Sequence, residues 1–221
     1  MVKIKQNDFV EIEFTGKIAE TGEIFDTNIK EEAKKAGLDI KNIKPFLLSI
    51  GHKMLPPGLD KDLGGKEIGK NYSIEINPEN AFGKRNPEMI RMIPTKLFHK
   101  QNINPERGTQ LTLDGQLVRV LSNSSGRTLV DFNNPLAGKK IKYDYKIIRK
   151  IKEQKEKVDA IQEFLFRRKF EFDIKDKKII FKVKKEEEVF IKMFQPKFKE
   201  ILGMEIEGKI TEEENKGKNS K

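Results

Sequence analysis

Cysteine and tryptophan are absent from this 221-residue sequence, and histidine occurs only twice. Without cysteine the chain forms neither disulfides nor thiolate metal sites, which excludes the usual small secreted scaffold. No apolar run reaches the roughly 20 residues of a membrane-spanning helix, and the opening residues, MVKIKQNDFVEIEF, contain no apolar run of signal-peptide length. We therefore expect a soluble, cytoplasmic protein that needs neither a metal nor a cofactor.

The formal net charge is +10, but the excess of basic residues is spread along the chain. Residues 151–221 hold 19 Lys or Arg against 16 Asp or Glu, so they contribute only +3 of that total. Acidic and basic residues alternate in stretches such as KEQKEKVD, a pattern typical of a solvated, salt-bridged surface. A nucleic-acid partner is therefore not expected. A basic ribosome- or RNA-associated factor is the alternative, although the chain contains no recognised RNA motif.

Hydrophobic periodicity divides the chain into three regions. In the first 83 residues it predicts strands at residues 9–14, 23–26, 45–50 and 72–76, with short helices at 31–36 and 59–63. Residues 84–134 begin and end with polar residues, and between them we expect a helical turn at 95–98 and strands at 111–113, 116–121 and 128–132. Strand alternation then resumes at residues 141–148. We therefore expect a strand-rich core that is interrupted by a second unit and completed after it.

The third region mixes helix and strand signals. Apolar residues at helical spacing predict a helix at 158–166 and helical structure at 189–202, where Pro196 must start, kink or break a helix. Between them, residues 170–174 and 179–183 predict a hairpin, and residues 204–210 predict a last strand. The final residues, 211–221, lack large apolar side chains and are expected to be disordered.

Several separated motifs in the first region resemble the catalytic domain of the FKBP family of peptidyl-prolyl cis/trans isomerases. In chain order they are Phe14, the run Gly22 to Asp26, Pro45-Phe46, Gly51 with Gly58-Leu59, Ala81-Phe82-Gly83, and Tyr143. The resemblance implies an α+β fold in which an antiparallel half-barrel sheet wraps a short helix. The catalytic domain would comprise residues 1–83 and 135–152.

The interrupting segment resembles the insert-in-flap chaperone domain of the SlyD-like group in that family. The similar strings are IRMIPTKLF, which begins at Ile90, and the closing Asn133-Asn134-Pro135-Leu136-Ala137-Gly138. Relatives usually have histidine where this chain has Asn134, and their histidine-rich, metal-binding tail is missing here. Residues 84–134 would form the β-rich insert domain, and residues 153–210 a small α+β domain that resembles the extra region of the long archaeal members.

Rotation of an Xaa-Pro bond meets a barrier of roughly 18–20 kcal/mol because the amide has partial double-bond character. A dry, apolar pocket favours the twisted amide, which is less polar than the planar one, so no nucleophile or metal is required. The resemblance implies that such a pocket is lined by Phe14, Phe25, Asp26, Phe46, Leu55, Pro56, Leu59, Phe82 and Tyr143.

Three pocket positions depart from the family pattern. Leu59 replaces a frequent tryptophan, Phe82 replaces a frequent tyrosine and thus lacks its hydroxyl, and Pro56 has no backbone N–H to offer a ligand. Loss of one hydrogen bond costs on the order of 1 kcal/mol, so a non-enzymatic holdase chaperone with a weakened isomerase pocket is the alternative function.

For the insert, the resemblance implies binding of unfolded polypeptides through an apolar surface. The candidates are Met89, Ile90, Met92 and Ile93, because methionine adapts to varied partners, although filling a small core explains the same residues. In the third region Phe190, Phe194 and Phe198 offer more apolar surface than a small unit easily buries. A homodimer through residues 153–210 and ordinary packing both account for that surface.

Overall fold

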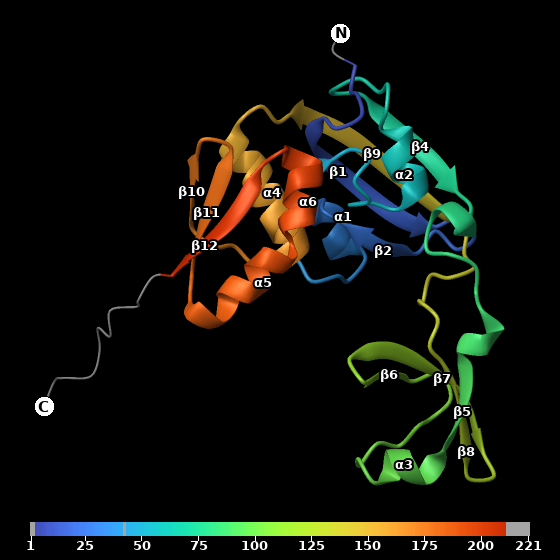
Figure 1. Cartoon of the computed structure of the whole chain (residues 1–221). Coiled ribbons are helices and arrows are strands. Elements are labelled where there is room, and N and C mark those ends of the chain that lie inside the picture. The colour runs from blue at the N-terminus through green and yellow to red at the C-terminus, as the bar shows by residue number, and fades with distance from the viewer. Residues whose placement is uncertain (1–2, 42, 211–221) are drawn as a thin grey trace, which may run out of the picture.

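The structure is a computed structural model that describes residues 3–41 and 43–210. The stretch 211–221, for which the sequence predicts disorder, lies outside the described residues. Figure 1 shows two larger bodies packed together and a smaller one that projects from them. Within the described ranges no helix is long and apolar enough to cross a membrane.

The first body is built on a five-stranded antiparallel sheet, as the α+β prediction requires. Its strands are β1 (Phe9–Ile18), β2 (Ile24–Thr27), β3 (Phe46–Ser49), β4 (Asn71–Ile76) and β9 (Ile141–Lys150), arranged β2-β1-β9-β4 with β3 also paired to β1. The helices α1 (Lys30–Lys35) and α2 (Pro57–Asp62) and the 3-10 turn η1 (Pro78–Asn80) connect them. Each strand and helix predicted in residues 1–83 is present, and β1 runs longer than predicted.

The strand that follows the insert, β9, lies at the centre of this sheet. It pairs with β1 from Val10↔Lys150 to Ile18↔Ile141 and with β4 along its other edge. Alternate residues of β9 are fully buried, which is the two-residue period expected of a strand with one face on the core. The sheet is therefore completed only by a strand that comes after the insert.

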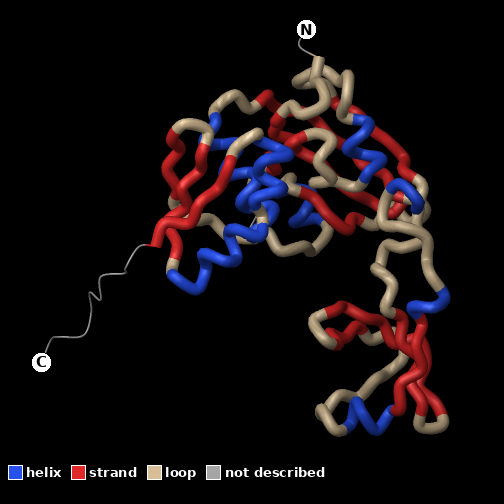
Figure 2. Tube along the Cα trace, viewed as in Figure 1, coloured by secondary structure: helices blue, strands red, loops and turns tan. Residues whose placement is uncertain are grey.

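The insert, residues 84–134, forms a four-stranded sheet of its own, and Figure 2 shows that it is mostly strand. Its elements are η2 (Pro87–Met89), β5 (Ile90–Pro94), α3 (Thr95–His99), β6 (Gln110–Leu113), β7 (Gln116–Ser124) and β8 (Arg127–Asp131), with the strands ordered β5-β8-β7-β6. A small cluster that we call the insert core, Phe98, Val118 and Val130, is buried beneath this sheet.

Side chains at the base of the insert hold its two connecting segments together. The backbone N–H of Asn86 donates to Oδ1 of Asn133 (2.8 Å), and Nδ2 of Asn133 donates back to the carbonyl of Asn86 (2.9 Å). Arg85 pairs with Asp131 at 2.6 Å, and Asn133 also donates to Asp131. These bonds fix the entry and exit of the insert side by side.

The C-terminal unit, residues 153–210, combines one helix layer with a three-stranded sheet. Its elements are α4 (Gln154–Phe166), β10 (Phe172–Lys175), β11 (Lys178–Val183), η3 (Lys185–Glu187), α5 (Glu188–Met193), α6 (Gln195–Leu202) and β12 (Glu205–Ile210). The predicted hairpin is β10-β11, and β12 joins it in parallel to β11. Pro196 lies in the first turn of α6, so the helical stretch at 189–202 is two helices.

A cluster of phenylalanine rings lies in the core of the C-terminal unit. Phe166 lies within 5.1–5.6 Å, centroid to centroid, of the rings of Phe181, Phe190, Phe194 and Phe198. This cluster is continuous with the core beneath the five-stranded sheet, and α4 contacts β3 directly. The C-terminal unit is therefore packed onto the first body, whereas the insert has a separate core.

We predict that Phe181→Ala destabilises the chain by about 3–5 kcal/mol, because Phe181 is fully buried and its removal leaves a cavity. Phe172→Ala is the matched control, since Phe172 touches the Phe181 ring from a half-buried position and should cost clearly less. Urea unfolding followed by circular dichroism measures both changes. Equal losses for the two variants would contradict the placement of Phe181 at the centre of the cluster.

Candidate functional site

Five of the predicted pocket residues form a line of aromatic rings on the concave side of the five-stranded sheet. Successive rings meet edge to face at centroid distances of 5.8–6.0 Å, the geometry that aromatic pairs prefer. The line runs Phe46, Phe14, Tyr143, Phe25, Phe82, and its members come from β3, β1, β9, β2 and the turn after η1. Residues far apart in the sequence are thus brought into one apolar row.

Gly16 on β1 makes room for the middle of this row. A Cβ atom on Gly16 would lie 2.7 Å from Cζ of Phe25 and 2.8 Å from Cε1 of Tyr143, closer than real side chains approach. Gly16 pairs with Tyr143 on one side and with Asp26 on the other, next to a bulge in the β1–β2 pairing. Any side chain at position 16 would therefore push the two rings apart.

The two residues that follow Asp26 in the sequence, Thr27 and Asn28, hold the backbone of Phe14 in place. Oγ1 of Thr27 donates to the carbonyl of Phe14 at 2.8 Å. The backbone N–H of Phe14 donates to Oδ1 of Asn28, whose Nδ2 donates to the carbonyl of Ile12, both at 2.7 Å. Sequence reasoning missed these positioning residues and Gly16. An available signal was Thr-Asn directly after Phe-Asp, because asparagine side chains readily pair with backbone groups.

Helix α2 closes one side of the row. Pro56 and Pro57 open the helix, and the carbonyl of Pro56 accepts the backbone N–H groups of Leu59 and Asp60 at 3.0 Å each. Leu59 is fully buried in the same core as the rings, and Leu55 packs against that core from a half-buried position. The predicted floor and side residues of the pocket therefore lie together, and Pro56 presents no donor at the helix start.

Two polar groups flank the rings. Desolvation raises the pKa of the Asp26 carboxyl above its usual range, and the backbone N–H of Thr27 opposes that rise. Desolvation, and after it the charge of Asp26, raises the pKa of the Tyr143 hydroxyl. Tyr143 is 2% exposed and therefore stays a neutral phenol through the physiological range.

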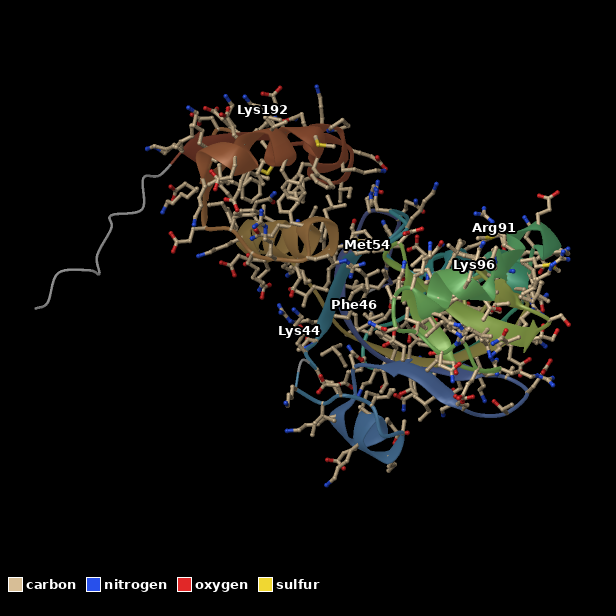
Figure 3. The ribbon with its side chains drawn as sticks, turned by 90° about the horizontal axis from the view of Figure 1, so that it is seen from below. Lys44, Phe46, Met54, Arg91, Lys96 and Lys192 are labelled. Atoms are coloured by element: carbon tan, nitrogen blue, oxygen red, sulfur yellow. The ribbon has the colours of Figure 1, made fainter. Side chains whose placement is uncertain are left out.

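The C-terminal unit reaches the row at Phe46. Figure 3 shows Lys44 and Phe46 on the segment that faces helix α4. A cavity of about 230 Å³ lies there between Phe46, Leu47 and residues of α4, and Lys44 forms an ion pair with Glu163 of that helix. The first ring of the row thus has α4 behind it.

The four insert residues predicted to bind unfolded chains lie in different environments. Met92 is 59% exposed, while Met89 and Ile90 are half-buried. Ile93 packs against the insert core, which is the alternative role that the sequence left open. Met89 also lines a cavity of about 440 Å³ that extends from Phe82 to Leu117 and Phe132 on the insert. A cavity with both apolar and polar walls therefore connects the end of the ring row to the insert.

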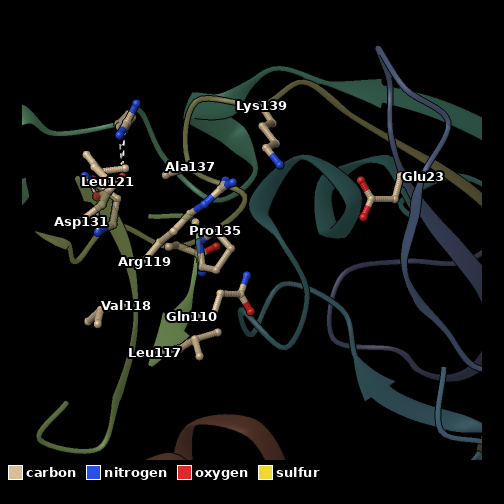
Figure 4. A pocket seen from close by; sticks show the side chains of 14 residues that line it. Glu23, Gln110, Leu117, Val118, Arg119, Leu121, Asp131, Pro135, Ala137 and Lys139 are labelled. Carbon is tan, nitrogen blue, oxygen red and sulfur yellow. Dashed lines mark hydrogen bonds and ion pairs between the residues drawn. The ribbon is translucent and has the colours of Figure 1, made fainter. Parts of the chain in front are cut away.

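A third cavity, of about 540 Å³, lies between the insert and the five-stranded sheet. Figure 4 shows Arg119 and Lys139 at its wall and Glu23 on the opposite side, contributed by β7, the returning segment and the turn before β2. Among residues 3–41 and 43–210, no group of three or more His, Cys, Asp or Glu side chains is placed to hold a metal ion. The site offers apolar rings and a few polar groups, which suits binding of an extended peptide.

Comparison with known proteins places this site in a family. A model described as FKBP-type peptidyl-prolyl cis-trans isomerase matches residues 2–99, and one described as FKBP26, IF domain, matches residues 91–136. A short-type peptidyl-prolyl cis-trans isomerase of Methanocaldococcus jannaschii is 27% identical over 146 residues, which cover 65% of this chain and 92% of that protein.

Two bacterial relatives agree with this assignment. A probable FKBP-type 16 kDa peptidyl-prolyl cis-trans isomerase of Pseudomonas fluorescens is 32% identical over 47% of this chain and 71% of its own length. The FKBP-type peptidyl-prolyl cis-trans isomerase SlyD of Aeromonas hydrophila is 27% identical over 62% of this chain and 59% of its own length. The chain therefore belongs to the FKBP-type peptidyl-prolyl cis-trans isomerases.

Proposed function

We propose that the row of aromatic rings is the site of prolyl isomerisation and that the insert binds unfolded chains, so that the protein is an isomerase and a folding chaperone in one. The observation that carries the proposal is the row itself, which continues at Phe82 into the cavity shared with the insert. In this proposal residues 1–83 and 135–152 catalyse prolyl isomerisation. Residues 84–134 bind the unfolded client chain, and residues 153–210 support the pocket.

Catalysis in such a pocket rests on differential binding. A planar amide is strongly polarised and well solvated by water, whereas the twisted amide has lost resonance and is less polar. Rings that exclude water therefore disfavour the planar form more than the twisted one. Asp26, at the rim of the row, is the acidic group beside the rotating bond. We place this activity in the cytoplasm, in keeping with the absence of cysteine.

The pocket is tested by Gly16→Ala, for which we expect kcat/KM to fall about 10-fold to 100-fold, since the added methyl group displaces Phe25 and Tyr143. Gly64→Ala is the control, because its Cβ would meet only the carbonyl of Lys61, at 3.4 Å. Acceleration of the cis/trans exchange of an Xaa-Pro peptide gives both values. An unchanged rate for Gly16→Ala would show that the row of rings is not the catalytic site.

Binding of unfolded chains by the insert is supported by its exposed apolar side chains. Met92, Leu97 and Leu117 are 59%, 45% and 46% exposed, so the insert presents three large apolar side chains to solvent. Leu117 and Met89 also line the cavity that reaches Phe82. A client held on this surface would have its prolyl bonds at raised effective concentration near the rings.

For Met92→Ser we expect the dissociation constant for a permanently unfolded polypeptide to rise about threefold to tenfold, because a partly buried methionine contributes roughly 1 kcal/mol. Peptide isomerisation should not change, since Met92 lies outside the row. Ile174→Ser serves as control, because Ile174 is exposed on the C-terminal unit. Equal weakening by both variants would mean that the insert has no special role in client binding.

We also propose that the C-terminal unit forms a homodimer. Val189 and Met193 lie one helical turn apart on α5 and are 70% and 71% exposed, and Ile210 at the end of β12 is 46% exposed. The expected molar mass by light scattering is that of two chains, and Met193→Lys should return it to one chain. A wild-type mass of one chain at micromolar concentration would contradict the dimer.

A further inference from the structure

The proposed pocket contains one unusual polar group, the hydroxyl of Tyr143. Eight of the nine pocket residues carry apolar side chains or, in Asp26, a carboxyl group. Pro56 lacks the backbone N–H that another residue would place at the start of α2, and Phe82 has no hydroxyl. Tyr143 is therefore the one pocket residue whose side chain is a permanent hydrogen-bond donor at neutral pH.

This hydroxyl has no hydrogen-bond partner within the described ranges, whereas the hydroxyls of the other two tyrosines in the sequence do. Tyr145, two residues further along β9, donates to Oδ2 of Asp62 at 2.5 Å. The oxygen of Tyr72 accepts the backbone N–H of Glu67 at 2.9 Å. Tyr143 is only 2% exposed, and buried tyrosine hydroxyls are usually paired. Its oxygen is not among the fully buried side-chain atoms without a partner in the described ranges, which are Ser49 Oγ and Glu67 Oε2, so it retains access to solvent and a ligand in the ring row is able to supply its acceptor.

The register of the sheet places Tyr143 beside the ring row, where a bound peptide would supply an acceptor. Asp26, Gly16 and Tyr143 are direct neighbours across β2, β1 and β9. Two strand spacings separate Asp26 from Tyr143, about 10 Å between their Cα atoms, and the rings of Phe25 and Tyr143 meet in the space that Gly16 leaves. The Tyr143 ring lies edge to face with Phe14 and Phe25 in the middle of the row. Its hydroxyl is therefore next to the rings on which a proline would lie.

We propose that the Tyr143 hydroxyl donates the hydrogen bond that anchors the bound prolyl segment, and that the acceptor is a backbone carbonyl oxygen outside the rotating amide. The inference rests on the proposed function, since it requires substrate in the ring row. A donor to the rotating carbonyl would bind the planar amide best, because twisting removes negative charge from that oxygen, and would oppose catalysis. A donor to a neighbouring carbonyl binds ground state and transition state alike.

The test compares Tyr143→Phe with Tyr145→Phe, two variants on the same strand that each lose one oxygen. For Tyr143→Phe we expect KM to rise about fivefold to tenfold, the effect of one ordinary hydrogen bond, with kcat essentially unchanged. Its melting temperature should not fall, because no protein bond is lost. Tyr145→Phe should show the opposite pattern, with a lower melting temperature from the lost bond to Asp62 and unaltered KM.

Three results would overturn the inference. They are an unchanged KM in Tyr143→Phe, a fall in kcat at constant KM, which would mean that the hydroxyl acts only in the transition state, and an equal rise of KM in Tyr145→Phe. Failure of the proposed pocket looks different, because Gly16→Ala would then leave catalysis intact. Titration of both tyrosine variants with the same Xaa-Pro peptide, followed by peptide NMR shifts, measures the bond independently of turnover and should show weaker binding only for Tyr143→Phe.

Discussion

Pairing between β1 and β9 is the interaction on which the rest of the molecule depends. The backbone hydrogen bonds along this pair join strands that are far apart in the sequence. The first strand, β1, ends at Ile18, and β9 begins 123 residues later at Ile141. Since β9 also pairs with β4, the sheet has no continuous centre without it. The insert, which lies between these strands in the sequence, must therefore leave the sheet and return to it at nearly the same point. The reciprocal bonds of Asn86 and Asn133 at the base of the insert meet that requirement.

The same pairing creates the ring row. Phe14 and Tyr143 come from β1 and β9, and Gly16 leaves the space in which Phe25 meets Tyr143. The C-terminal unit adds a second support, because α4 lies against β3 behind Phe46 and shares one core with the sheet. The insert differs, since its core is its own and it joins the sheet through connecting segments and the polar bonds between them. The structure thus combines a ring row that is supported from two sides with a separately packed insert.

Much of this architecture follows from local sequence signals. Alternation of apolar residues identified most strands, because a strand with one buried face has a period of two, but β5 in the insert was not predicted. Pro196 placed a helix boundary, since proline lacks the N–H that a helix interior requires. The features that were not predicted depend on contacts between residues that are distant in the sequence. The need for glycine at position 16 exists only once β2 and β9 flank β1, and the parallel docking of β12 depends on where α5 and α6 return the chain. Asn28 likewise acts through backbone groups on β1.

The central position of β9 also determines when the enzyme can be completed during its synthesis. Between the end of β1 at Ile18 and the end of β9 at Lys150, a ribosome that adds roughly 5–20 residues per second needs about 7–26 seconds. In that interval the first four strands of the sheet lack their central partner, while the insert, whose sheet and core are contained in residues 84–134, has all its own strands. The nascent chain thus has a complete insert, the unit proposed to bind clients, before it has a complete isomerase domain.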